Sequence, residues 1–330
     1  MVRVGVAITT YNDIEMTTRL LESIIANTEF DEDYALLVFD DGTPNEAVVS
    51  ALETLCMLHG VDFARHERNK GIPAAWNSCV RTLRERHGCE FVVLLNNDLI
   101  VPPESKNWLR CLVYFLENNE CWSVGLPLIQ ADAEGRPLPY DPSSWGDKPT
   151  IVGAAVGCSF GVKFSVWQKL KQPDGSVGFF ESLRSFHEEV DAGFEAARLG
   201  YYSFMLPGPP LIHLGGRTFA RNPELLWMEI PDSKKVGVEI NLDEYVECIK
   251  RSKLYPGEVK KVILGKIGEG VVDRMSFTRY VFAKKWGVPL EDYDDPAIVV
   301  HNRLVKGAKQ RVKWLDPHTL EAKEDEAVAP

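Results

Sequence analysis

The stretch FVVLLNNDLIVP, residues 91–102, joins two apolar runs through three polar residues. Five apolar residues lead to Asn96, Asn97 and Asp98, so the pattern predicts a buried strand that ends on two amides and a carboxylate. A polar turn at a strand end would explain the triplet, and so would a carboxylate that holds a metal ion at a sheet edge. The triplet alone favours the turn, and the other strand ends have to be compared with it.

The first half of the chain alternates predicted strands with predicted helices. Apolar, β-branched runs predict strands at residues 2–10, 34–41, 61–66, 90–98 and 121–129. Helical spacing of apolar residues predicts a helix that Asn12 caps, a second that ends near residue 58, and two more at 72–87 and 105–119. This order predicts an α/β fold, a mostly parallel sheet flanked by helices.

Three polar clusters follow strands of this predicted sheet. They are TTYN at residues 9–12, DDGT at 40–43 and NND at 96–98. Ligands of parallel α/β sheets bind outside the carboxyl ends of the strands. Three polar clusters that converge on one edge therefore indicate a binding site, which favours the metal hypothesis for Asp98.

Composition and charge limit the classes of function. The chain has 330 residues and a formal net charge of −11, whereas a protein that binds duplex nucleic acid normally has a basic face, so we expect no duplex partner. Seven scattered cysteines without a CxxC pair argue against a zinc ribbon or a disulfide framework and indicate a cytoplasmic protein. No apolar run approaches the ~18 residues of a membrane helix, and we expect no signal peptide.

The usual phosphate-binding loops are missing from the sequence. It contains neither G-x-G-x-x-G after the first strand nor G-x-x-x-x-G-K-[ST], which argues against a dinucleotide dehydrogenase and a P-loop kinase. A bound diphosphate would then need another counter-charge. Mn²⁺ or Mg²⁺ on a carboxylate supplies one, and Asp98 is the natural candidate.

Four motifs occur in order between residues 7 and 102: AITTYND, FDDGTPNE, ERNKGIPAAWN and LLNNDLIVP. Together they resemble the nucleotide-binding half of a family 2 glycosyltransferase of the Rossmann-like GT-A fold, and weaker downstream motifs extend the resemblance to about residue 287. The bacterial rhamnosyl- and galactofuranosyl-type inverting transferases are the members it most resembles. The resemblance implies metal-dependent, inverting transfer of a hexosyl or deoxyhexosyl group from a UDP-, dTDP- or GDP-sugar to a glycan, protein or small-molecule acceptor.

The resemblance also implies roles for individual residues. Asp41 matches the acidic residue that hydrogen-bonds the base, with Asp40 as the alternative. Asp98 matches the metal-binding aspartate, although the family triplet more often begins with Asp where this chain has Asn96. His213 matches a second metal ligand. The residues expected at the donor nucleotide are Thr9, Tyr11, Asn12, Asp40, Asp41, Asn69 and Asn97.

The segment SFHEEVDAGFEAARLGY, residues 185–201, reads as a helix with an acidic first turn. Acidic residues stabilise a helix N-terminus, which would explain Glu188, Glu189 and Asp191 without catalysis. The resemblance implies instead that one of them is the general base that deprotonates the acceptor hydroxyl. Glu189 matches the usual base position and Asp191 is its rival.

The domain organisation follows from the loss of the strand–helix rhythm after about residue 220. We expect a GT-A core at 1–220, divided into a nucleotide-binding half at 1–129 and an acceptor half at 130–220. A helical extension at 221–315 and a disordered tail at 316–330 would follow. Trp145 and Arg217 lie in loops where they could meet a sugar or a diphosphate.

Two other functions and the oligomeric state stay open from the sequence. A sugar nucleotidyltransferase has a similar sheet, but it normally begins with a glycine-rich basic loop that AITTYND lacks. A catalytically decayed sugar- or nucleotide-binding protein would explain Asn96 and Glu189. A homo-oligomer is compatible with the sequence.

Overall fold

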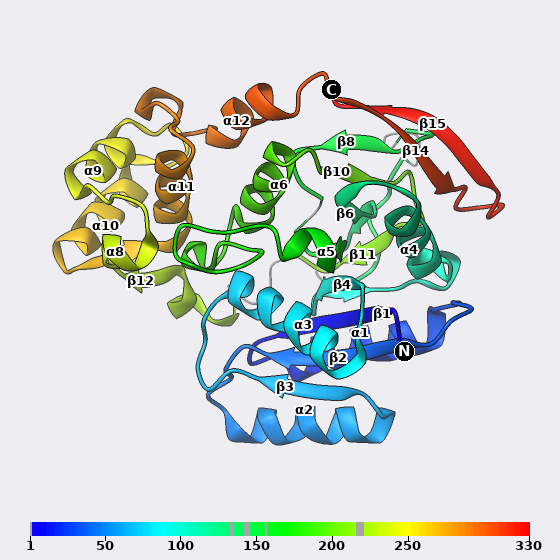
Figure 1. Cartoon of the computed structure of the whole chain (residues 1–330). Helices are drawn as coiled ribbons and strands as arrows, with labels where there is room; N and C mark the ends of the chain where they lie inside the picture. The colour runs from blue at the N-terminus through cyan, green and yellow to red at the C-terminus, as the bar shows by residue number, and fades with distance from the viewer. Residues whose placement is uncertain (1, 133–134, 142–145, 156, 216–220) are drawn as a thin grey trace.

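The computed structural model describes residues 2–132, 135–141, 146–155, 157–215 and 221–330. At its centre lies an eight-stranded sheet with the order β3-β2-β1-β4-β9-β6-β10-β8 (Figure 1). Its strands are β1 (Val4–Thr10), β2 (Tyr34–Asp40), β3 (Asp62–Arg65), β4 (Phe91–Asn96), β6 (Cys121–Gly125), β8 (Thr150–Val152), β9 (Ser159–Lys163) and β10 (Tyr202–Met205).

The sheet is mostly parallel, which confirms the prediction. Strands β3, β2, β1 and β4 run parallel to one another, and β6 pairs in parallel with β10. Strand β9 lies between β4 and β6 and is antiparallel to both. The carboxyl ends of β1, β2 and β4 therefore meet at one edge, as the polar clusters predicted.

Helices cover both faces of this sheet. Along β1, Val6 and Ile8 belong to the apolar cluster that contains α1, while Ala7 belongs to the cluster that contains α3. This alternation follows from the two-residue period of a strand. The helices between the strands are α1 (Ile14–Asn27), α2 (Glu46–His59), α3 (Ile72–His87), α4 (Trp108–Asn118), α5 (Phe164–Trp167) and α6 (Glu188–Arg198).

The start of α1 differs from the prediction. Asp13, not Asn12, caps this helix, because Asp13 Oδ1 accepts a hydrogen bond from the backbone amide of Met16 at 3.1 Å. Asn12 adopts a left-handed backbone conformation with φ of 52°. Its side chain turns away from the helix and donates to Asn222 Oδ1 at 3.1 Å.

A second, three-stranded sheet has the order β5 (Leu99–Ile100), β11 (Leu211–His213) and β7 (Leu128–Gln130). The single strand predicted at 121–129 is wrong, because the chain leaves the large sheet after β6 and joins this small one as β7. Pro127 stands at the break, where it cannot donate a ladder hydrogen bond. The pairing of His213 with Leu99 brings His213 next to Asp98.

The C-terminal part places helices beside the sheet (Figure 1). They are α8 (Ser233–Val236), α9 (Leu242–Arg251), α10 (Gly257–Gly268), α11 (Arg274–Lys285) and α12 (Pro296–Leu304). A short two-stranded sheet of β12 (Trp227–Glu229) and β13 (Val271–Asp273) accompanies them. None of the helices in the described ranges combines the length and apolar character that a membrane crossing requires.

The prediction of a disordered tail at 316–330 is wrong. Strands β14 (Lys309–Leu315) and β15 (Ala322–Val328) form an antiparallel hairpin on the side of the sheet away from α9 (Figure 1). Val312, Trp314 and Ala327 are buried, and β14 packs on α4. The amide of Asn119 donates to Lys313 O at 2.7 Å, which fixes the hairpin to the core.

Candidate active site

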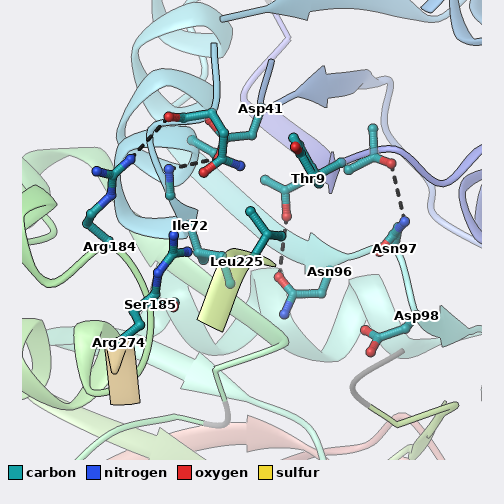
Figure 2. A pocket seen from close by; sticks show the side chains of 15 residues that line it. Thr9, Asp41, Ile72, Asn96, Asn97, Asp98, Arg184, Ser185, Leu225 and Arg274 are labelled. Atoms are coloured by element: carbon teal, nitrogen blue, oxygen red, sulfur yellow. Dashed lines mark hydrogen bonds between the residues drawn. The ribbon is translucent and has the colours of Figure 1, made fainter. Parts of the chain in front are cut away.

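A pocket opens at the carboxyl ends of β1, β2 and β4 (Figure 2). Six of the residues predicted at the donor or the metal line it: Thr9, Tyr11, Asp41, Asn69, Asn97 and Asp98. Thr10 and Asn96 of the polar clusters also line the pocket. The other lining residues were not singled out from the sequence, namely Gly71, Ile72, Ala75, Arg184, Ser185, Leu225 and Arg274. The polar clusters at the ends of β1, β2 and β4 therefore line one common pocket.

Asp98 and His213 meet at one side of this pocket. His213 Nε2 lies 3.3 Å from Asp98 Oδ2, and the backbone amide of Leu214 donates to Asp98 O at 2.8 Å. Asp98 Oδ1 is buried and has no hydrogen-bond partner in the described chain. A buried carboxylate oxygen without a partner is costly, so the site favours a cation at this oxygen.

The carboxylate of Asp98 is a ligand that suits Mn²⁺ or Mg²⁺. Two ligands on neighbouring vertices of an octahedral Mg²⁺ ion, each about 2.1 Å from it, are about 3 Å apart. The distance of 3.3 Å between His213 Nε2 and Asp98 Oδ2 is close to that value. Within the described residues no third His, Cys, Asp or Glu joins them, so further ligands would have to come from water or from a bound substrate.

Asp41 lines the pocket, but hydrogen bonds within the protein occupy its carboxylate. Oδ1 lies 2.7 Å from His66 Nδ1 and accepts from the Lys70 backbone amide at 3.0 Å. Oδ2 accepts from the Asn69 side chain at 2.9 Å and from the Gly71 amide at 2.8 Å. A carboxylate offers about four acceptor positions, so Asp41 organises the 66–71 loop and has no position left for a base.

The 66–71 loop is in turn fixed against the segment that precedes α6. Gly71 has a φ of 96°, and a Cβ there would lie 2.3 Å from Arg184 O. The next amide, that of Ile72, donates to the same Arg184 oxygen at 2.8 Å. Only glycine permits this close approach, which joins the two segments.

Two other residues predicted at the donor lie outside the pocket lining. Asp40 is fully buried, and its carboxylate accepts from the backbone amide of Thr43 at 3.1 Å. Burial raises the pKa of Asp40, although its hydrogen bonds with Thr43 lower it. Asn12 donates its backbone amide to Thr43 Oγ1 at 2.7 Å. Both residues therefore shape the turn after β2.

Side-chain hydrogen bonds also hold the strand ends that face the pocket. Thr9 Oγ1 donates to Asn96 Oδ1 at 3.3 Å, and the amide of Asn97 donates to Thr10 Oγ1 at 3.2 Å. Burial raises the pKa of Tyr11. The ends of β1 and β4 are thus tied together in the arrangement that forms the pocket floor.

Glu188 and Glu189 are the first two residues of α6, and the side chain of Glu188 is buried whereas that of Glu189 is partly buried. Burial and then the neighbouring Glu189 raise the pKa of Glu188 well above its usual range, and Glu188 Oε2 has no partner in the described chain. Burial also raises the pKa of Glu189, against hydrogen bonds from the backbone amides of Glu189 and Val190. Raised carboxyl pKa values are typical of general bases and acids.

Glu189 does not line the first pocket but borders a second, open depression of the surface. That depression is lined mainly by small and apolar residues, with His301 as its other titratable group. Burial, then Asp98, then Glu189 raise the pKa of the Cys158 thiol, so both carboxylates act on this cysteine.

Asp191 lies in a different environment from Glu189. Its side chain is fully buried, with Lys285 Nζ 2.7 Å from Oδ2 and Trp286 Nε1 donating to Oδ1 at 2.8 Å. Lys285 also pairs with Glu195 at 3.1 Å. This network joins α6 to α11 and favours a structural role for Asp191.

Sequence reasoning missed the two arginines of the pocket. Arg184 precedes α6, and Arg274 is the first residue of α11. Neither belongs to a motif, and only the fold brings them to the strand ends, so no local signal could have identified them. Trp145 and Arg217 lie outside the described residues.

Residues 5–160 match the family model of Glycosyl transferase family 2. The chain carries a family 2 glycosyltransferase domain. The match covers the four motifs quoted above, so the predicted family and the predicted class of enzyme are confirmed. The bacterial rhamnosyl- or galactofuranosyl-type specificity stays a prediction. A search of curated proteins found no match to the chain.

Solved structures share the fold of this chain at low sequence identity. A mannosyltransferase from Pyrobaculum calidifontis, in complex with GDP-Man and Mn²⁺, has 15% identity and a TM-score of 0.50, with 91% of this chain and 75% of that chain covered. GalNAc-T7 with UDP, GalNAc and Mn²⁺ has 15% identity and a TM-score of 0.52, with 92% and 59% covered. TarS 1–349 of S. aureus has 14% identity and a TM-score of 0.50, with 97% and 98% covered. These likenesses confirm the GT-A fold.

Proposed function

We propose that this chain is a metal-dependent, inverting glycosyltransferase that moves a sugar from a nucleotide-diphosphate sugar to an acceptor hydroxyl. The observation that carries the proposal is Asp98, whose buried Oδ1 lacks a partner in the described chain while His213 lies beside Oδ2. The family 2 domain and the solved structures that contain Mn²⁺ with GDP-Man or UDP support it.

In this proposal Asp98 and His213 hold Mn²⁺ or Mg²⁺ at the diphosphate. The ion, when bound, neutralises charge that develops on the leaving diphosphate. Thr9, Tyr11, Asn69 and Asn97 are the candidates for contact with the nucleoside, since all four line the pocket. Asp41 contributes by fixing the conformation of the 66–71 loop, which contains Asn69. UDP, dTDP and GDP are the candidate nucleotide carriers of the sugar.

Glu189 is the general base that we favour. Its carboxylate takes the proton of the acceptor hydroxyl as the oxygen forms a bond to the anomeric carbon. The bond from that carbon to the diphosphate oxygen breaks, and the diphosphate leaves with the electron pair. Attack from the face opposite the diphosphate inverts the anomeric centre. Glu189 borders an open depression that an acceptor can reach, whereas Asp191 is fully buried in an ion pair with Lys285, and this difference supports Glu189 over Asp191.

A reducing compartment suits the seven cysteines, all of which are free and buried. We therefore keep the cytoplasm as the proposed location. The acceptor is a glycan, a protein or a small molecule in this proposal, and a homo-oligomer stays open.

The proposal is tested by nucleotide-diphosphate release from UDP-, GDP- and dTDP-sugars with Mn²⁺, with Mg²⁺ and with EDTA. We expect slow, metal-dependent hydrolysis of one donor, which Asp98→Ala abolishes. Binding of a nucleotide without turnover of any donor, with or without acceptors, would instead identify a decayed binding protein. If the protein neither releases a nucleotide diphosphate nor binds a nucleotide, the proposal is overturned.

A further inference from the structure

Two arginines from outside the family 2 domain enter the same pocket as the predicted nucleotide residues. The domain match ends at residue 160, whereas Arg184 and Arg274 come from the segment before α6 and from the start of α11. Figure 2 shows both on one side of the pocket and Asp98 on the other. The pocket therefore has a cationic side opposite its candidate metal site.

Neither guanidinium is neutralised by an ion pair within the described chain. Arg274 is only 5% exposed, and its Nε is buried without an acceptor among the described residues. The Nε of Arg184 is also buried and without an acceptor there, and Arg184 Nη2 donates only to the backbone oxygen of Asn69, at 3.2 Å. The nearby carboxylate of Asp41 is already occupied by the 66–71 loop.

The two charges also act on each other. Burial, and next the charge of Arg184, lower the pKa of Arg274 to about 10, against the carboxylates of Asp41 and Glu188, which raise it. A buried cation is costly unless an opposite charge compensates it, and a second cation beside it adds to that cost. An anion that enters the pocket would remove both costs, because arginine presents a planar fork of donors that matches phosphate oxygens.

We propose that Arg184 and Arg274 form an anion site for the phosphate groups of the nucleotide. The pocket is shared with Thr9, Tyr11 and Asn69, so the nucleotide is the molecule that would bring its phosphates there. The site rests on the geometry, and the identity of the anion rests on the proposed function. It follows that the segment after residue 220 takes part in donor binding, since it supplies Arg274 and also Leu225.

The test is isothermal titration calorimetry of the full chain in EDTA, so that no metal ion contributes. The probes are the nucleoside diphosphate that binds the wild type most tightly, its parent nucleoside, and inorganic pyrophosphate. The variants are Arg274→Gln and Arg184→Gln. Arg279→Gln is the matched control, because Arg279 lies on α11 outside the pocket lining and contacts Tyr255.

Loss of one charge-assisted phosphate contact should weaken the binding of the nucleoside diphosphate by about tenfold or more. We expect each pocket variant to lose this much affinity for the diphosphate and for pyrophosphate, while the parent nucleoside and the Arg279→Gln control stay within about twofold of wild type. Arg184→Gln keeps the test decisive if Arg274→Gln fails to fold, as circular dichroism would report.

Two results would overturn the anion site. Unchanged diphosphate affinity in both variants would show that the arginines do not bind the donor. If the variants lose affinity for the parent nucleoside, while the ratio of diphosphate affinity to nucleoside affinity stays at the wild-type value, the arginines contact the base and not the phosphates. Failure of the wild type to bind any nucleoside diphosphate, even with Mn²⁺, would contradict the proposed function itself and is thus distinguishable.

Discussion

At the scale of single residues, position in the pocket and freedom to act are separate properties. Asp41 and Asp98 both line the pocket. The carboxylate of Asp41 already accepts four hydrogen bonds, whereas Asp98 keeps one buried oxygen without a partner in the described chain. The sequence predicted a contact with the base for Asp41 and a metal for Asp98, and only the second carboxylate is left available.

Replacement of Asp98 should separate function from stability. We expect Asp98→Ala to lower donor hydrolysis by about 100-fold or more, because several kcal/mol of metal stabilisation are lost. The melting temperature should not fall, since a buried oxygen without a partner is removed. His213→Ala should weaken the affinity for Mn²⁺ by about 10- to 100-fold. Activity assays at varied Mn²⁺, with thermal melts, measure both effects.

The matched control is another aspartate–histidine pair of the chain. Asp62 Oδ2 lies 2.8 Å from His87 Nε2, at the start of β3 and far along the chain from Asp98. Asp62→Ala should leave metal dependence unchanged. An Asp98→Ala enzyme that still responds fully to Mn²⁺ would contradict the assigned site.

The pH dependence of the reaction should report the titration of Glu189. A general base acts when it is deprotonated, and burial raises the pKa of Glu189. The rate should therefore fall as the pH drops through a pKa above the ordinary glutamate value of about 4.3. Glu189→Gln should lower kcat by about 100-fold or more and remove this acidic limb. A limb that persists in this variant would assign the titration to another group, with Glu188 as the first candidate.

At the scale of elements, the contact between α6 and α11 explains why an acidic motif contains both a candidate base and a structural residue. Glu189 and Asp191 are two positions apart on α6, so they point in different directions on the helix. Glu189 borders an open depression, while Asp191 is paired with Lys285 of α11. The sequence left these two rivals open because their partners lie far along the chain.

Asp191→Asn should act on stability more than on catalysis. Removal of one partner of a buried ion pair typically costs about 3 kcal/mol, and the melting temperature should fall accordingly. The activity of the folded fraction should stay within about threefold of wild type, whereas loss of a general base would lower it by at least about 100-fold. Asp191→Leu with Lys285→Met should recover much of the stability. A large loss of kcat in a fully stable Asp191→Asn protein would restore Asp191 as the base.

At the scale of the whole molecule, features that depend on local sequence patterns were predictable, whereas features that depend on contacts between distant segments were not. The strand–helix order was predictable because each element carries its own apolar pattern, as α3 does at Ile72–His87. The β15 sequence AKEDEAV is charged and buries little besides Ala327, so its composition suggested disorder. Pairing with β14 stabilises it, and that pairing is not visible locally. The pocket arginines were missed for the same reason.

The hairpin of β14 and β15 should contribute to stability without affecting the site. Trp314 is 3% exposed and belongs to the main apolar cluster. Trp314→Ala should lower the free energy of unfolding by about 3 kcal/mol, because a large cavity replaces the ring. Nucleotide affinity at a temperature where the variant is folded should not change. Val328→Ala, at a 38% exposed position of the same hairpin, is the control. Equal stability of Trp314→Ala and wild type would mean that the hairpin does not pack as described.

The close approach of Gly71 to Arg184 has a consequence for the order of events in a catalytic cycle. A nucleotide that fixes the conformation of the 66–71 loop also fixes the segment that leads to Glu188 and Glu189, because the two segments are joined at Gly71 and Arg184. In that segment Arg184, Phe186 and His187 all have positive φ. The donor should therefore bind first and the acceptor second. Free nucleoside diphosphate would then compete with the donor but not with the acceptor in product-inhibition kinetics.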